Sequence, residues 1–177
     1  TTPGVPDIYQ GTEFYDNSLV DPDNRRLVDF DARRSVLRGG EPVGAAAAHW
    51  RDGCAKARLT AVGLAARGAR PGLFTVGDYV PLAVQGAAAR HFVAFARSSG
   101  DDAAIVVAPR LCLSLLEGRA DLTGIALGDT RVVVPPALAG RRMSDAVSGK
   151  PVTVEGAMLL AELFDGVPLA FLSTPGR

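Results

Sequence analysis

The sequence has few of the residues that build metal and redox centres. It contains two cysteines, Cys54 and Cys112, and two histidines, His49 and His91, among 177 residues. The cysteines lie far apart and match no metal-ligand or redox spacing, so we expect buried, reduced thiols. We expect both histidines to be isolated from acidic and cysteine clusters, as surface or strand residues. The sequence therefore predicts no metal site and no cofactor.

The sequence also lacks an excess of either charge and a long apolar run. Its 19 basic and 19 acidic residues give a formal net charge of zero, so nothing attracts the chain to nucleic acid or to an anionic membrane. No apolar run approaches the roughly 20 residues that a membrane helix needs. We therefore expect a cytoplasmic protein of one or two soluble domains, with no nucleic-acid or membrane partner.

Polar side chains are densest between Pro3 and Arg26. Within this segment, Pro6 to Gln10 is predicted to be a short buried strand, and Gly11 to Val28 a long loop. The loop carries several acidic residues and an Asp-Pro-Asp-Asn turn that leads to two adjacent arginines. Carboxylates, amides and guanidinium groups are the side-chain groups that form hydrogen bonds with sugar hydroxyls. The segment therefore indicates a sugar-binding site at the end of a strand.

Two motifs in this segment resemble a known enzyme family. Residues 3–13, reading PGVPDIYQGTE, resemble the eighth barrel strand of the alpha-amylase superfamily of glycoside hydrolases. Residues 18–30, reading SLVDPDNRRLVDF, are more specific and resemble the maltooligosyl trehalose synthase family within glycoside hydrolase family 13. Leu27 departs from the family pattern, which usually has proline there, and this change loosens the turn. The resemblance continues weakly to the C-terminus.

The resemblance, taken with the chain length, implies an α/β part followed by an all-β part. A closed (β/α)8 TIM barrel takes about 250 residues, and the helical part of this chain ends near Leu73. Residues 1–73 are therefore expected to hold the end of the catalytic barrel, with the eighth strand, the substrate loop and the last helix. Residues 74–177 are expected to form an antiparallel, sandwich-like β domain. The missing N-terminal barrel of the same enzyme is the implied partner and lies upstream.

Helical periodicity supports the α/β part independently of the resemblance. A short helix is predicted over Phe30 to Arg38, followed by an irregular stretch from Gly39 to Gly44. A longer helix is predicted to begin after Asp52 as N-cap and to stop at Gly68 and Pro71. Its apolar stripe at helical spacing consists of Ala55, Leu59, Val62 and Ala66. We expect this helix to pack beside the strand on the outside of the barrel.

Short segments rich in Val, Phe and Leu follow, and Gly, Pro and Asp separate them. This pattern is typical of an antiparallel sandwich. The expected strands are residues 79–84, 92–97, 105–109, 131–135, 152–155 and 167–172. Residues 158–165 fit a helical turn and a strand equally, and the alternation over 91–95 leaves open which face is buried.

The resemblance also implies substrate-binding residues in the polar loop. Asp21 and Arg25 match family positions that hydrogen-bond a sugar ring on the non-reducing side of the cleavage point, and we include Arg26 beside them. Tyr15 is placed to meet solvent or ligand. An alternative remains open: the charges of Asp21, Asp23, Arg25 and Arg26 form a salt-bridge network that stiffens the loop.

No catalytic residue is predicted in this chain. Retaining glycoside chemistry needs two carboxylates about 5 Å apart, but the family's catalytic carboxylates lie on earlier barrel strands. Glu13, at the end of the predicted strand, is expected to support the site without touching the ligand. Trp50, the single tryptophan, precedes the long helix, so the β domain lacks an aromatic platform for sugars and is expected to be structural.

The resemblance implies a (1→4)-α-D-glucan 1-α-D-glucosylmutase, which converts the reducing-end α-1,4 linkage of a maltooligosaccharide into an α,α-1,1 linkage in trehalose biosynthesis. The chain alone is expected to be inactive. Two alternatives stay open. One is the C-terminal part of an alpha-amylase-type hydrolase, and the other is a non-catalytic carbohydrate-binding or structural β domain.

Overall fold

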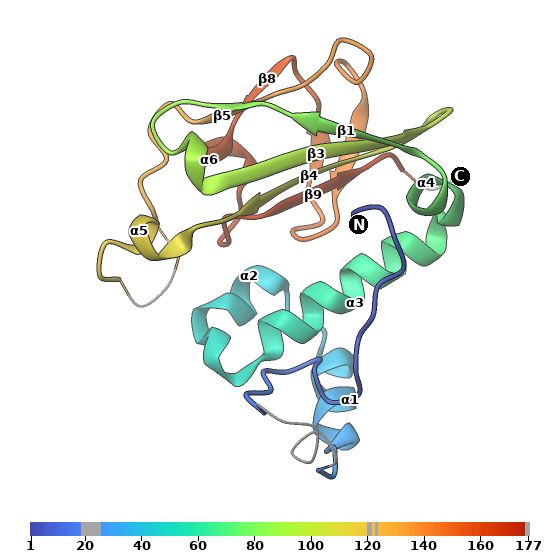
Figure 1. Cartoon of the computed structure of the whole chain (residues 1–177), viewed down its shortest axis with the longest axis vertical. Coiled ribbons are helices and arrows are strands. Elements are labelled where there is room, and N and C mark those ends of the chain that lie inside the picture. The colour runs from blue at the N-terminus through green and yellow to red at the C-terminus, as the bar shows by residue number, and fades with distance from the viewer. Residues whose placement is uncertain (19–25, 120–121, 123, 176–177) are drawn as a thin grey trace.

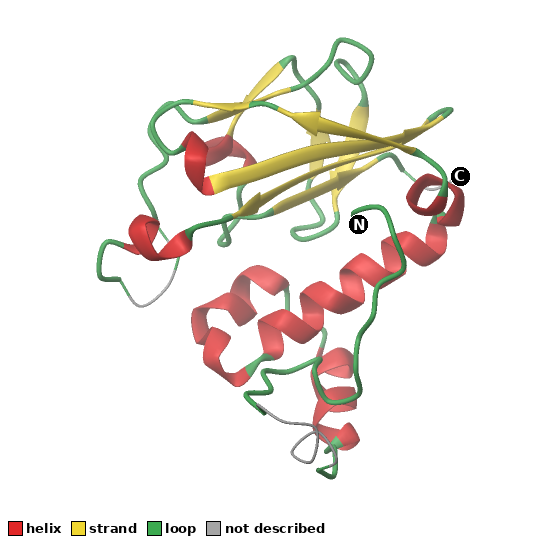
Figure 2. Ribbon diagram, in the orientation of Figure 1, coloured by secondary structure: helices red, strands yellow, loops and turns green. Residues whose placement is uncertain are grey.

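Helices fill the first half of the chain and strands the second, as the computed structural model shows (Figures 1 and 2). The structure describes residues 1–18, 26–119, 122 and 124–175. The helices are α1 (Phe30–Gly39), α2 (Val43–Ala46), α3 (Cys54–Ala69), α4 (Pro71–Thr75), α5 (Cys112–Leu116) and α6 (Leu160–Leu163), with 3-10 turns η2 (Ala47–Asp52) and η3 (Ala89–His91). Over the described ranges, no helix has both the length and the apolar character needed to cross a membrane.

The strands form two antiparallel sheets. They are β1 (Asp78–Leu82), β2 (Val84–Gln85), β3 (Phe92–Ser99), β4 (Asp102–Pro109), β5 (Arg131–Val133), β6 (Arg142–Asp145), β7 (Pro151–Thr153), β8 (Ala157–Leu159) and β9 (Ala170–Ser173). The larger sheet has the order β1-β3-β4-β9-β6-β7, and the smaller has the order β2-β5-β8. The predicted antiparallel β part is therefore confirmed.

The strand boundaries differ from the predicted ones in several places. The segment predicted as one strand over 79–84 divides into β1 and β2, which belong to different sheets. The sequence pattern missed β6 entirely. The ambiguous residues 158–165 adopt both alternatives in turn, because β8 ends at Leu159 and α6 begins at the next residue.

Strand β4 and the middle of β3 are buried on both faces, which explains the imperfect alternation in their sequence. Between the two sheets lies the first core, to which β4 contributes Ala103, Ile105 and Val107. On the other face of the larger sheet, Ala104 and Val106 enter a second core. Apolar side chains are therefore required at successive positions, as in strands covered on both sides.

The helical part covers that other face of the larger sheet (Figure 1). Leu59, Val62 and Ala66 of α3 pack against the second core. Leu73 and Phe74, which connect the helical part to β1, are fully buried in the same core. The predicted packing of this helix against the outside of a barrel does not occur here, because the sheet takes up its apolar stripe. The domain boundary at residues 73–74 remains a prediction.

The strand predicted over Pro6 to Gln10 is wrong for this structure. These residues form no strand and are exposed, and Val5 before them is 91% exposed. A strand needs a neighbour to accept its backbone hydrogen bonds, and the described residues supply none at this place. Figure 1 shows instead that the first residues run beside α3, where Arg67 of α3 donates to the Gly4 carbonyl at 2.6 Å. The described part of the chain contains no barrel.

Local hydrogen bonds account for the helix boundaries. Asp29 caps α1 by accepting from the Ala32 amide at 2.9 Å, and the predicted helix over Phe30 to Arg38 is confirmed. The irregular stretch predicted after it ends sooner, because α2 begins at Val43. Asp52 accepts from the Cys54 amide at 2.8 Å, although Gly53 occupies the cap position of α3. Pro71 starts α4 and does not simply end α3.

Replacing glycine with alanine should change the free energy of unfolding in opposite directions at Gly63 and Gly77. At Gly63, inside α3, a new Cβ would meet nothing within 4 Å, so Gly63→Ala should raise the free energy of unfolding by about 0.5 to 1 kcal/mol through helix propensity. At Gly77, a new Cβ would lie 2.4 Å from the Leu73 carbonyl oxygen and 2.9 Å from that of Ser98. Gly77→Ala should therefore lower the free energy of unfolding by about 1 to 3 kcal/mol.

Urea unfolding of the two variants measures both effects, and each variant serves as the other's control. Two changes of the same sign would show that the packing around Gly77, or the exposure of Gly63, differs from that in the structure.

Candidate functional site

The predicted substrate-binding residues divide into two groups. Asp21 and Arg25 lie outside the described residues, together with Asp23 of the alternative salt-bridge network. Arg26 and Tyr15 are described, and both are exposed. The pairing of Asp21 with Arg25 therefore stays a prediction, and only Tyr15 and Arg26 can be placed.

The ring of Tyr15 is held by residues from the helical part. Trp50 of η2 meets it edge to face, with 5.9 Å between ring centroids and 87° between planes. The Lys56 ammonium of α3 lies 5.5 Å from the centroid of the Tyr15 ring and donates to the Phe14 carbonyl at 2.9 Å. The ring is thus positioned while 47% of the residue stays exposed. The contact with Trp50 could not be predicted from the sequence, because 35 positions separate it from Tyr15 and no local pattern links them.

Glu13 is bound to its neighbours. Its carboxylate accepts from Arg33 Nε at 3.0 Å and from the Gly11 amide at 2.9 Å. The Arg33 guanidinium also lies 4.6 Å from the centroid of the Phe14 ring. Burial favours a higher pKa for Glu13, but hydrogen bonds from its own amide, Arg33 and Gly11 outweigh it and lower the pKa. Glu13 is therefore an ionised carboxylate that ties the start of the loop to α1.

Asp16 precedes the undescribed part of the loop and is also held as a carboxylate. The Ser18 hydroxyl and amide donate to it at 2.5 and 2.9 Å. These hydrogen bonds lower the pKa of Asp16, and the charges of Arg26 and Arg33 contribute. Because an ionised carboxylate only accepts hydrogen bonds, Asp16 offers acceptors to the hydroxyl groups of a ligand.

His49 is not isolated, which corrects the sequence-based prediction. Its Nδ1 lies 2.5 Å from Asp52 Oδ2, and its Nε2 lies 3.0 Å from Glu41 Oε1. The Glu41 and Asp52 carboxylates raise the pKa of His49. The Cys54 thiol completes the group, since ligand atoms of His49, Asp52 and Cys54 all lie within 4.8 Å of one another. The turn between η2 and α3 brings these residues together, and the short spacing H-x2-D-x-C was the available signal.

The other histidine and the cysteines also differ from expectation. His91 ends η3 and is buried, with Nδ1 3.2 Å from the Leu111 carbonyl and Nε2 accepting from Arg90 Nε at 3.0 Å. It is therefore neither a surface nor a strand residue. Cys54 and Cys112 are free thiols, as expected, but they are half-buried.

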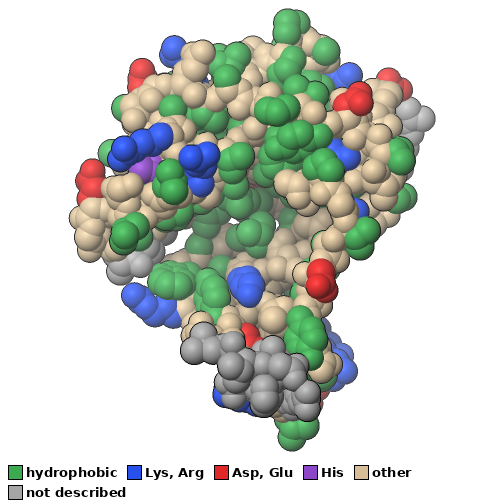
Figure 3. All heavy atoms as spheres, viewed as in Figure 1, with side chains coloured by type: hydrophobic (Ala, Val, Ile, Leu, Met, Phe, Trp, Pro, Cys, Tyr) green, Lys and Arg blue, Asp and Glu red, His purple; other side chains and the backbone are tan. Residues whose placement is uncertain are grey.

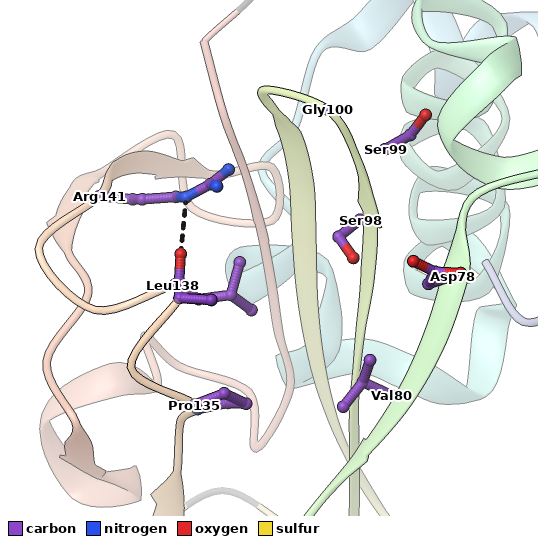
Figure 4. A pocket seen from close by; sticks show the side chains of 9 residues that line it. Asp78, Val80, Ser98, Ser99, Gly100, Pro135, Leu138 and Arg141 are labelled. Carbon is purple, nitrogen blue, oxygen red and sulfur yellow. Dashed lines mark hydrogen bonds between the residues drawn. The ribbon is translucent and has the colours of Figure 1, made fainter.

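A surface pocket lies away from these residues, where the β3–β4 turn meets the loop before β6 (Figure 4). Its volume is about 270 Å³, and Asp78, Ser98 and Arg141 are among the residues that line it. The Arg141 guanidinium donates to the carbonyls of Ala137 and Asp101. No aromatic ring is among its lining residues, so the pocket offers no stacking surface for a sugar.

Comparison with known proteins shows relatives of one kind. No family model matches the chain. Two curated proteins from Mycobacterium tuberculosis, of strains CDC 1551 and H37Rv, are described as putative maltooligosyl trehalose synthases. Each is 38% identical to this chain over 172 residues, which are 97% of this chain and 19% of the relative. The chain therefore spans about a fifth of the length of these relatives.

Solved structures agree with this result. A variant of maltooligosyltrehalose synthase from Arthrobacter ramosus superposes with a TM-score of 0.71 at 39% identity, covering 96% of this chain and 20% of that one. A second maltooligosyl trehalose synthase structure has a TM-score of 0.61 over 97% of this chain and 20% of that one. At 21% identity, it supports the fold alone. The matched region is the C-terminal portion.

Proposed function

We propose that this homologue of the C-terminal fifth of maltooligosyl trehalose synthases is part of a (1→4)-α-D-glucan 1-α-D-glucosylmutase. The observation that carries the proposal is 38% identity over 97% of the chain. The complete protein acts on a maltooligosaccharide and supplies the rest of the catalytic barrel from outside this chain. Residues 1–73 then form the end of that barrel, and the β domain stabilises it.

The proposed reaction moves one glucosidic bond within a single substrate. The α-1,4 bond to the reducing-end glucose breaks, and the remaining sugar is held covalently on a carboxylate of the enzyme. The freed glucose turns in the site, and its anomeric hydroxyl displaces the carboxylate to form an α,α-1,1 bond. Because water would give hydrolysis at this stage, the site has to exclude it.

The polar loop is proposed to bind a sugar ring beside the cleavage point. Arg25 and Arg26 supply guanidinium donors, and Asp21 supplies acceptors, so that together they match the donors and acceptors of sugar hydroxyls. Tyr15 offers an exposed ring that Trp50 and Lys56 already hold in place. A ring fixed before binding loses little conformational freedom when a ligand covers it.

The outer surface of the helical part is proposed to meet the missing barrel. Val5, Leu27, Phe30 and Leu37 are exposed apolar residues of this part, and Figure 3 shows exposed hydrophobic side chains on it. Large apolar groups exposed on one part of a chain are typical of a surface that another part covers. The exposed segment at Pro6 to Gln10 becomes a barrel strand only when neighbouring strands pair with it.

An Arg25→Ala variant of the complete protein tests the loop. Loss of one charge-assisted hydrogen bond, about 1.5 to 3 kcal/mol, should lower kcat/KM for maltopentaose roughly ten- to a hundredfold. The melting temperature should change little. Arg38→Ala removes an exposed arginine of α1 and is the matched control, with unchanged kinetics expected.

The salt-bridge alternative predicts the opposite pattern for Arg25→Ala, with a lower melting temperature and unchanged kinetic constants. That result would remove Arg25 from the proposed binding site. Product analysis of the unsubstituted protein distinguishes the two chemistries, since a mutase forms trehalose-ended oligosaccharides and a hydrolase forms shorter oligosaccharides or free glucose.

A further inference from the structure

Three different metal-binding side chains meet at the turn between η2 and α3. They are the His49 imidazole, the Asp52 carboxylate and the Cys54 thiol, and their ligand atoms all lie within 4.8 Å of one another. The set therefore combines nitrogen, oxygen and sulfur donors at close range. Tetrahedral sites for zinc use these donor types.

The backbone of the turn holds this arrangement. His49 has non-helical dihedral angles, φ −121° and ψ 37°, so the backbone kinks within η2 at this residue. Gly53 then adopts the left-handed conformation with φ +84°, and a Cβ at this position would lie 2.9 Å from Phe14 Cβ. Only glycine fits such a turn without strain, so the fold fixes the position from which Cys54 begins α3.

Neighbouring groups orient two of the three side chains. Glu41 lies 3.0 Å from His49 Nε2 and leaves Nδ1 directed toward Asp52. The Cys54 amide donates to Asp52 Oδ1 at 2.8 Å, so Oδ2 is the oxygen that faces the imidazole. In metal sites, a carboxylate commonly holds the second nitrogen of a ligating histidine in the same way.

We propose that His49 Nδ1, Asp52 Oδ2 and Cys54 Sγ bind a divalent transition metal of the zinc type, with Glu41 as the residue that positions the imidazole. On binding, the proton shared by His49 Nδ1 and Asp52 Oδ2 and the proton of the Cys54 thiol both pass to solvent, as the metal forms bonds to the nitrogen, the oxygen and the sulfur. Three protein ligands leave one coordination position for water. None of the three ligands belongs to the proposed sugar-binding loop, although the turn that carries them packs against Phe14 of that loop.

Cobalt(II) added to the full, metal-free chain is the direct test, because it reports the ligands spectroscopically without any enzyme assay. We expect the visible bands of four-coordinate cobalt and a thiolate-to-cobalt charge-transfer band in the near ultraviolet, at one equivalent of metal. Zinc(II) should then displace the cobalt and abolish both. The chain has only two cysteines, so the source of the thiolate is easy to assign.

Single substitutions assign the ligands. Cys54→Ser should abolish the charge-transfer band, while the matched Cys112→Ser variant keeps it. Glu41→Gln should weaken cobalt binding about 10- to 100-fold, as loss of such an orienting partner does elsewhere. A merely structural Glu41–His49 contact would leave the cobalt affinity unchanged. Circular dichroism on each variant establishes that it is folded.

A second measurement needs no variant. Cobalt or zinc should slow the reaction of one thiol, identified by peptide mapping as Cys54, with a maleimide reagent, and leave Cys112 reactive. The absence of a charge-transfer band in the unsubstituted chain, its persistence in Cys54→Ser, or equal reactivity of the two thiols with and without metal would each overturn the site.

Discussion

Arg97→Met should lower the free energy of unfolding by about 3 kcal/mol or more. Arg97 of β3 is 1% exposed, and its guanidinium donates to four carbonyl oxygens. These belong to Thr1, Phe74, Gly77 and Asp78, at distances from 2.7 to 3.2 Å. Methionine fills similar space but donates nothing, so one buried and three partly buried hydrogen bonds to these carbonyls would be lost.

Two further variants separate the hydrogen bonds from the charge. Arg97→Lys keeps the charge, but a single ammonium group cannot reach the four carbonyls that the planar guanidinium group contacts. We therefore expect an unfolding free energy between those of the wild type and Arg97→Met. Arg131→Met removes an exposed arginine of β5 and should change the free energy of unfolding by less than about 0.5 kcal/mol. Equal losses of unfolding free energy for Arg97→Met and Arg131→Met in urea would contradict the stabilising role assigned to the buried Arg97 guanidinium.

The chain alone should form no product from maltopentaose, whereas the complete protein should form trehalose-ended product. A glycosidic general acid needs a raised pKa. In the part of the chain that the structure describes, the three carboxyls with a shifted pKa, Glu13, Asp16 and Asp52, are all shifted downward. These three carboxyls therefore do not suit the role of the acid, and we expect the acid and the nucleophile to lie outside this chain, as the family resemblance implies.

Chromatography of the reaction mixture, with heat-treated chain as blank, measures this. Trehalose-ended product or free glucose above the blank would show that the chain holds its own catalytic carboxylates. Activity of the complete protein in the same assay rules out an unsuitable substrate.

Local patterns predicted helices α1 and α3 and most of the strands, but not which elements pack together. Leu59, Val62 and Ala66 recur at helical spacing, and this alone indicates α3. The same spacing states only that one face is apolar, so it could not reveal that the face covers the larger sheet. The strand predicted over Pro6 to Gln10 is wrong because its partners are absent from the described part of the chain. An apolar run becomes a strand only beside other strands, and the described residues supply none.

The functional residues show the same limit. The place of Tyr15 in the polar loop indicated contact with solvent or ligand, but its contact with Trp50 depends on the fold of η2 and cannot be predicted from periodicity. The group of His49, Asp52 and Cys54 is compact in sequence, but it matches no common metal-ligand spacing. What assembles it is the left-handed turn at Gly53, whose role emerges only from its contact with Phe14.

The place of β9 in the larger sheet determines when that sheet can be completed during synthesis. This strand follows all the other described strands in sequence, yet it lies between β4 and β6 (Figure 1). During synthesis, the β3–β4 and β6–β7 hairpins can each form from neighbouring segments. They cannot join until Ala170–Ser173 leaves the ribosome, so the backbone N–H and C=O groups along the facing edges of β4 and β6 stay unpaired until then. Chaperones that bind nascent chains would have this interval in which to act.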